Sequence, residues 1–280
     1  MIITIFGIIS LLNRHRSIAI GSFASVFARG IQIISVLIMT GIATRSFSNE
    51  EFGLWAILIS FLYSGYAFDF GYRSAMTNRL TAMVADSSGE PNLHQKEFYL
   101  SIFYLQIGIG ILGAIFVIFL GNYISWGIML KIHQPDILKY INQLVIVIFI
   151  LIFLNVPLLS SSGGFFAFHE VHFDSYLQAL QSLVLLGGFW FVNVYKILSF
   201  KNVVIVYFLV FLLFGLIKTV VLFKHRTWNI VWVPFNRLLN NIKSISSVSF
   251  DFFFIEYVKL NYFDRKYFLS RLNWGPKKCG

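Results

Sequence analysis

Long runs of apolar residues, separated by short polar connections, dominate the chain. Each run has the roughly 20 predominantly apolar residues that a helix needs to cross the hydrocarbon core of a bilayer. We place six such segments at 17–44, 52–76, 98–120, 140–162, 174–195 and 202–223. The pattern predicts an all-α, polytopic membrane protein built on a six-helix transmembrane bundle.

Composition supports this class. Of the 280 residues, 58% are hydrophobic and only 12% are charged, whereas soluble domains carry about 25% charged residues. The longest connection, 77–97, is too short for a soluble domain between helices. Residues 1–12 are apolar but too short to span, so we expect them either to lie at the membrane interface or to be dispensable. Their charges follow the apolar run, the reverse of a secretory signal.

The distribution of Lys and Arg predicts the orientation. If the N-terminus is cytoplasmic, nine Lys and Arg residues near segment ends fall on the cytoplasmic side and five on the other. The single Cys279 and the lack of an Asn-x-Ser/Thr sequon suit a bacterial inner membrane. We therefore predict a multi-pass protein of the bacterial cell inner membrane, with both termini in the cytoplasm.

Charge is concentrated in the last part of the chain. Residues 1–223 hold 12 basic and 9 acidic residues, whereas residues 224–280 hold 10 basic and 3 acidic ones. We predict a bundle over 1–223 and a basic cytoplasmic tail over 224–280. Such a tail is attracted to anionic membrane lipids, although the positive-inside bias alone also explains it. No recognition fold accompanies the charge, so nucleic acid is not an expected partner.

Three charged residues interrupt the first two apolar segments. Arg29 lies near the middle of the first, and Asp69 and Arg73 lie in the second. Because intramembrane charge is costly, such residues usually face a bundle interior or an aqueous cavity. Asp69 and Arg73 have the i, i+4 spacing of an ion pair on one helix face.

Two interpretations of Arg29 remain open. It either grips an anionic ligand such as a phosphate with paired hydrogen bonds, or pairs with Asp69 and pins the first two spans together. We take Arg29, Asp69 and Arg73 as candidate substrate-binding residues of a cavity. Lys218 is weaker evidence, because its long side chain can reach the membrane surface.

Two short motifs resemble catalytic or metal sites but lack their context. Asp69-Phe70-Gly71 matches a kinase magnesium motif, yet the Gly-rich and catalytic loops of kinases are missing and the triplet falls in an apolar segment. His169 and His172 are three residues apart, whereas zinc proteases need a spacing of four. We expect no catalytic residues, no metal, no cofactor and no enzymatic activity.

Three stretches follow one another between residues 43 and 187: "ATRSFSNEEFGLWA", "DFGYRSAMTNRLTAMVA" and "FFAFHEVHFDSYLQALQSLVLLG". In these stretches the chain resembles the Wzx-type O-antigen and polysaccharide flippases of the multidrug/oligosaccharidyl-lipid/polysaccharide exporter superfamily. The resemblance implies the N-terminal lobe of a MATE-like exporter, with Asp69 and Arg73 facing a cationic central cavity. It also implies a polyprenyl-pyrophosphate-linked oligosaccharide as the substrate, a role in O-antigen or lipopolysaccharide synthesis, and other polysaccharide-assembly membrane proteins as partners.

The chain also departs from that family, whose members have two bundles of about six helices. Residues 249–276 resemble the start of the seventh helix, but charges such as Glu256, Lys259 and Asp264 interrupt the apolar run. We therefore expect a degenerate seventh segment and a truncated half of a flippase. The alternatives are an inactive remnant, a half-size unit that works as a homodimer, and a membrane enzyme such as a polymerase or acyltransferase.

Overall fold

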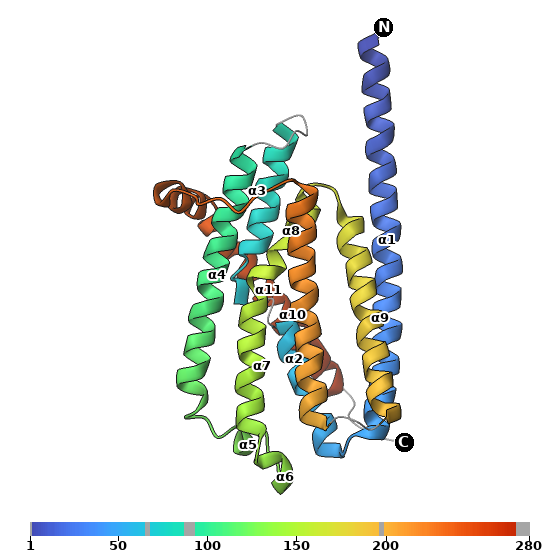
Figure 1. The fold of residues 1–280 in the computed structure, drawn as a ribbon, viewed down its shortest axis with the longest axis vertical. Coiled ribbons are helices and arrows are strands. Elements are labelled where there is room, and N and C mark those ends of the chain that lie inside the picture. The colour runs from blue at the N-terminus through green and yellow to red at the C-terminus, as the bar shows by residue number, and fades with distance from the viewer. Residues whose placement is uncertain (1, 65–67, 87–92, 196–198, 273–280) are drawn as a thin grey trace, which may run out of the picture.

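Apolar segments of the sequence become long, nearly parallel helices in the computed structural model, which describes residues 2–64, 68–86, 93–195 and 199–272 (Figure 1). Within these ranges every regular element is helical. The helices are α1 (Ile2–Ser46), α2 (Asn49–Ser64), α3 (Tyr72–Asp86), α4 (Leu93–Gly121), α5 (Trp126–Met129), α6 (Pro135–Leu138), α7 (Ile141–Asn155), a 3-10 turn (Pro157–Leu159), α8 (Ser160–Ala167), α9 (Val171–Tyr195), α10 (Phe200–His225) and α11 (Phe235–Leu272). The all-α prediction is confirmed.

Five stretches of the described helices are long and apolar enough to cross a membrane. They are Gly21–Ser46, Leu93–Gly121, Ile141–Ala167, Val171–Val192 and Phe200–His225. Each overlaps one of the six predicted segments. In the fourth segment, Pro157 opens a 3-10 turn between α7 and α8, because proline cannot donate the backbone bond that an α-helix needs.

The second predicted segment, 52–76, is not one continuous helix, which corrects the prediction. It is divided between α2 and α3, and Asp69-Phe70-Gly71 precedes α3 in a turn rather than lying inside a helix. Phe70 and Gly71 have φ values of 49° and 76°, in the left-handed region that a right-handed helix excludes. The Asp69 carboxylate accepts a hydrogen bond from the backbone N–H of Gly71 at 2.7 Å, as Asp side chains do in turns.

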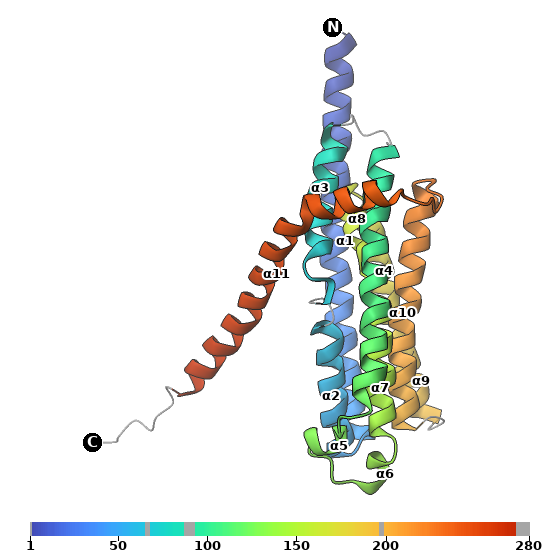
Figure 2. The same cartoon turned by 90° about the vertical axis from the view of Figure 1, so that its left-hand side faces the viewer.

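Helix packing gives the bundle its order. α1 packs along α9, α9 on α10, α10 on α7, and α7 on α4, while α3 packs on α8. In Figure 2 the ends of α3, α4 and α10 lie together at one end of the bundle, and α5 and α6 lie at the other. The N-terminal part of α1, which includes the segment expected at the membrane interface, extends beyond the bundle in Figure 1.

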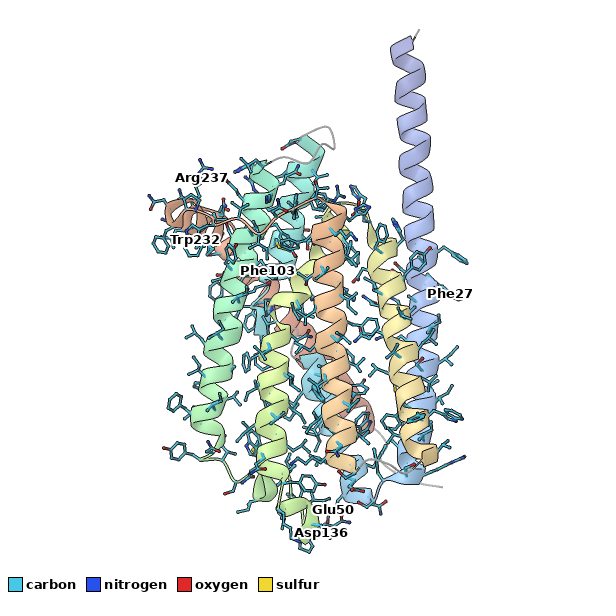
Figure 3. All side chains as sticks on the ribbon, in the orientation of Figure 1. Phe27, Glu50, Phe103, Asp136, Trp232 and Arg237 are labelled. Carbon is cyan, nitrogen blue, oxygen red and sulfur yellow. The ribbon has the colours of Figure 1, made fainter. Side chains whose placement is uncertain are left out.

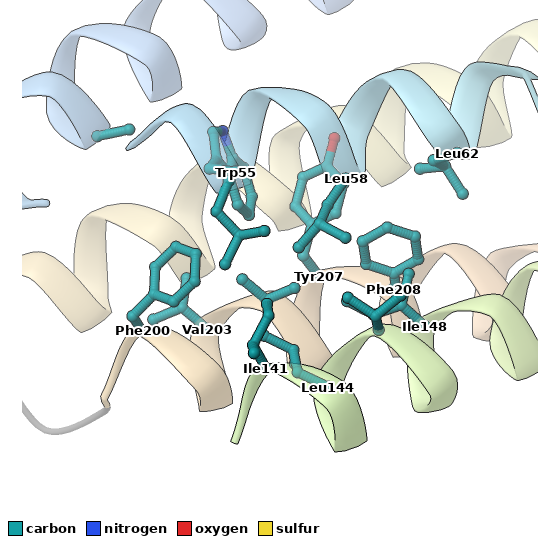
Figure 4. Packing of buried hydrophobic residues seen from close by; sticks show 14 of the residues in the cluster. Trp55, Leu58, Leu62, Ile141, Leu144, Ile148, Phe200, Val203, Tyr207 and Phe208 are labelled. Carbon is teal, nitrogen blue, oxygen red and sulfur yellow. The ribbon is translucent and has the colours of Figure 1, made fainter. Parts of the chain in front are cut away.

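Each half of the bundle is packed around its own cluster of buried apolar side chains. One contains Trp55, Leu58, Ile148, Tyr207 and Phe208, so that α2 packs against α7 and α10 (Figure 4). The other cluster, toward the opposite end, joins α3, α4, α8 and α10 with the chain after α10. Its buried members include Met76, Tyr99, Phe165, Leu222 and Trp228. The turn between α2 and α3 therefore coincides with the change from one cluster to the other.

Many large apolar side chains point away from both clusters. Phe27 of α1 is 59% exposed and stands off the bundle in Figure 3. Figure 3 also places Glu50 and Asp136 at one end of the molecule and Trp232 and Arg237 at the other. Apolar sides between two polar ends are what a membrane-spanning protein presents to lipid.

The long helix α11 takes up most of the described part of the region predicted to hold a basic tail and a degenerate seventh helix. Its first part lies across the end of the bundle and packs on α3 and α4, and its second part runs obliquely away (Figure 2). Arg237 forms an ion pair with Glu97 of α4 at 2.8 Å. The domain boundary at 223/224 stays a prediction, and Cys279 lies outside the described residues.

Candidate functional site

A polar cavity of about 590 Å³ opens between α1, α9 and α10, with further wall from α3, α7 and α8. Its charged lining residues in the described part of the chain are Arg29, Arg73, Asp174 and Lys218. Amide and hydroxyl groups also line it, among them those of Gln32, Ser35, Asn155, Gln178 and Gln181. Such groups are rare in membrane spans and mark ligand or ion pathways, so the cavity is the candidate binding site.

Arg29 lines this cavity from α1. It lies about two helical turns after Gly21, the first residue of the membrane-spanning stretch of that helix. No ion pair of Arg29 is found among the residues that the structure describes, and its side chain is exposed along the cavity. The geometry therefore brings Arg29 to the cavity rather than to Asp69.

Asp69 and Arg73 form the predicted pair. The Nε atom of Arg73 lies 3.6 Å from Oδ2 of Asp69, and the Asp69 side chain is only 2% exposed. Arg73 lines the cavity, whereas Asp69 lies behind it in the turn that precedes α3. Of the two, Arg73 is therefore placed to meet a ligand, and Asp69 is placed to orient Arg73.

Lys218 does not extend to the membrane surface, which corrects the interpretation made from sequence. It is 8% exposed, and its Nζ atom lies 2.9 Å from Oδ1 of Asp174 on α9. Two further donors complete the network: Ser162 Oγ donates to Oδ1 at 2.9 Å and Gln178 Nε2 donates to Oδ2 at 2.7 Å. A buried ion pair is favourable only when its remaining polar atoms are also satisfied, and this network fulfils that condition for Asp174.

The sequence analysis missed Asp174, although a signal was available. Asp174 is in the first turn of α9, and Lys218 is seven residues before the end of α10. Consecutive antiparallel helices bring such positions to a similar depth. An acidic and a basic residue at matched depth in neighbouring spans predict an ion pair.

The cavity wall is cationic overall. Three of its four charged residues are cations, and the one carboxylate is engaged by Lys218. Arg73 is paired with Asp69 behind the wall. Among the cations that line the cavity in the described part of the chain, Arg29 is thus the one left to a ligand. Arginine binds phosphate oxygens with two parallel hydrogen bonds.

The His169–His172 motif lies at the end of the bundle and not in the cavity. Glu170 pairs with Arg226 at 2.5 Å and lies 3.3 Å from Nδ1 of His225, joining the α8–α9 turn to the end of α10. Within the described ranges, no group of three or more His, Cys, Asp or Glu side chains is arranged to hold a metal ion. The motif therefore contributes an ion pair between two connections.

Comparison with known proteins shows the fold. No family model matches the chain, and no curated protein matches it. Among solved structures, it is similar to a MOP superfamily transporter from Pyrococcus furiosus, with a TM-score of 0.66 and 11% sequence identity. The match covers 84% of this chain and 52% of the other, so this chain spans about half the length of that transporter. The bundle thus has the fold of one part of a MOP superfamily transporter.

Proposed function

We propose that this chain forms one bundle of a membrane transporter that moves a polyprenyl-pyrophosphate-linked oligosaccharide, such as an O-antigen or exopolysaccharide repeat unit, across the bacterial inner membrane. The observation that carries the proposal is the cationic cavity, in which Arg29 is left unpaired by the described residues while Lys218 and Arg73 have carboxylate partners. The sequence resemblance to Wzx-type flippases supports the same substrate class.

The charged and the uncharged polar side chains of this cavity suit different parts of the proposed substrate. A pyrophosphate needs cations, and the oligosaccharide beyond it needs amide and hydroxyl groups. Gln32, Gln178 and Gln181 line the same cavity as Arg29, so a headgroup bound at Arg29 lies among side chains that hydrogen-bond sugar hydroxyls. The fold shared with a transporter favours transport over the membrane-enzyme alternative.

Alternating access supplies the mechanism for such a fold, since two units rock against each other around a site near the midplane. In this proposal the described bundle supplies one wall of that site. Arg29 holds the anionic headgroup, while the Asp174–Lys218 pair ties α9 to α10 so that the wall moves as one body.

Ligand binding by the full chain in lipid nanodiscs tests the proposed substrate class. We expect a polyprenyl-pyrophosphate-linked oligosaccharide to bind, and the lipophilic cation tetraphenylphosphonium to bind at least about tenfold more weakly, because the wall repels cations. Preferential binding of the lipophilic cation would contradict the proposal and indicate a transporter for cationic substrates.

A further inference from the structure

A smaller space, an apolar slot of about 230 Å³, lies between α1 and α2 and adjoins the polar cavity. Val36, Met39 and Tyr207 line both spaces. On the α2 side the slot is lined by Phe52, Trp55, Ala56 and Ile59. The two spaces therefore share a wall and differ in chemistry.

The slot offers a ligand almost no hydrogen-bonding groups along α1. Its polar residue there is Thr40, whose hydroxyl already donates to the backbone carbonyl of Val36 at 2.8 Å. Aromatic rings form the inner side: Trp55 and Tyr207 meet at 4.8 Å between ring centroids, and Figure 4 shows them facing each other from α2 and α10. Such a surface suits hydrocarbon better than a phosphate.

The order of the two spaces along α1 matches the order of groups in a lipid-linked substrate. Arg29 and Gln32 line the cavity, and Val36, Met39 and Thr40 follow toward the slot. Seven residues of helix separate Arg29 from Val36, which is about 10 Å along the axis. A headgroup at Arg29 therefore has an apolar surface about 10 Å farther along the same helix.

The direction also agrees with the predicted orientation. Gly21 of α1 lies against Val171 at the start of α9, and His225 lies 3.3 Å from Glu170, just before that helix. This end of α1 is therefore at the end of the bundle that is predicted to be cytoplasmic. A lipid in the cytoplasmic leaflet has its headgroup at that end and its tail toward the bilayer centre. The slot lies beyond Arg29 along α1, toward the opposite end of the bundle, where Phe52 is near the start of α2, so a tail in the slot runs away from the cytoplasmic end.

Helix packing leaves the slot accessible from the side. The part of α1 within the bundle packs on α9 but touches α2 only sparsely. Val36 is 38% exposed, and Ala56 is also exposed, so both helices present slot residues outward. A chain can thus lie in the slot while it continues into the surrounding lipid.

From these relations we infer that the α1–α2 slot is the binding site for the first isoprene units of the polyprenyl chain whose pyrophosphate lies at Arg29. This inference rests on the proposed function and assigns the tail subsite of the same ligand. A chain held beside the aromatic rings of Trp55 and Tyr207 stays with the bundle while its headgroup crosses.

Photo-crosslinking of the full chain in nanodiscs tests this site. The probe is geranylgeranyl diphosphate with a diazirine on an isoprene unit near the diphosphate, and labelled peptides are identified by mass spectrometry. We expect labelling at the slot residues of α1 and α2. Ala56→Trp fills the slot, so it should lower that labelling about tenfold. Ile57→Trp places the same ring on the neighbouring, outward-facing position and should leave labelling unchanged.

Two results would overturn the inference. One is equal labelling of the slot in wild type and Ala56→Trp. The other is equal labelling of the slot by a diazirine-bearing phospholipid, which would mean that bulk lipid occupies it. Binding of inorganic pyrophosphate to wild type and Arg29→Ala is measured separately. If Arg29→Ala loses pyrophosphate binding but the slot of the wild type is not labelled, only the tail site is refuted. If pyrophosphate binds Arg29→Ala as tightly as wild type, the proposed headgroup site is refuted.

Discussion

The Nζ atom of Lys218 lies 2.9 Å from Oδ1 of Asp174, and both side chains are nearly inaccessible. The pair joins α9 to α10 at the wall of the polar cavity. Removing one partner of a buried pair leaves an uncompensated charge, and this typically costs about 3–5 kcal/mol of stability.

The first prediction therefore concerns Lys218→Met. We expect a loss of about 3 kcal/mol and a clearly lowered melting temperature in detergent, because Asp174 then stays buried without its cation. The double variant Asp174→Asn with Lys218→Met should recover much of the loss, since Asn carries no charge and its Oδ1 still accepts the hydrogen bond from Ser162.

Lys139→Met is the matched control. Lys139 also forms an ion pair, with Asp136 at 2.9 Å, but both side chains are more than 70% exposed. Exposed pairs contribute about 0–1 kcal/mol, so this variant should melt close to wild type. Equal melting temperatures for Lys218→Met and Lys139→Met would show that the buried pair does not stabilise the bundle.

The second prediction concerns the turn before α3. Gly71 has a φ of 76°, and a Cβ atom there would collide with the backbone of Ser249 and Phe253 in α11. Ser249 Oγ also donates to the carbonyl of Phe70 at 2.6 Å, so α11 is tightly fitted to this turn. Gly71→Ala should cost about 1–3 kcal/mol through the strained backbone alone, with more from the collision.

Gly53→Ala provides the comparison for this substitution. Gly53 lies in α2 with open space around its Cα, and alanine in a helix interior is favoured over glycine by about 0.5–1 kcal/mol. Thermal unfolding should thus show opposite signs for the two variants. A neutral Gly71→Ala would mean that α11 is not held against the turn.

The third prediction is topological. The C-terminal ends of α3 and α10 lie together, and α6 lies at the opposite end (Figure 2). Reporter fusions at Asp86 and His225 should both give the cytoplasmic signal, while one at Pro135 should give the periplasmic signal. The inverse pattern would overturn the orientation inferred from Lys and Arg, and different signals at Asp86 and His225 would contradict the fold itself.

Sequence periodicity and composition predicted most of this fold, because transmembrane helices need long apolar runs that local sequence reveals. The turn at Asp69-Phe70-Gly71 escaped prediction since the apolar run before it was extended through the turn to Met76. A tertiary contact adds to the local Asp69–Gly71 hydrogen bond: Ser249, 179 residues after Phe70 in the chain, donates a hydrogen bond to the Phe70 carbonyl. A single sequence gives no sign of that contact.

The candidate site was predicted in part for a similar reason. Arg29 and Arg73 were identifiable because charge in an apolar run is costly wherever the run packs. Asp174 was missed because it lies near the start of its helix, where a carboxylate looks solvated. Only the packing of α9 on α10 shows that it is 2% exposed and bound to Lys218.

The central claim is that Arg29 binds the anionic headgroup, and affinity for a polyprenyl-pyrophosphate-linked oligosaccharide in nanodiscs tests it most directly. Arg29→Ala should weaken binding about tenfold or more, since a charge-assisted hydrogen bond contributes about 1.5–3 kcal/mol. Arg45→Ala removes an exposed arginine from the last turn of the same helix, away from the cavity lining, and should bind as wild type does. An affinity in Arg29→Ala equal to that of Arg45→Ala would contradict the account.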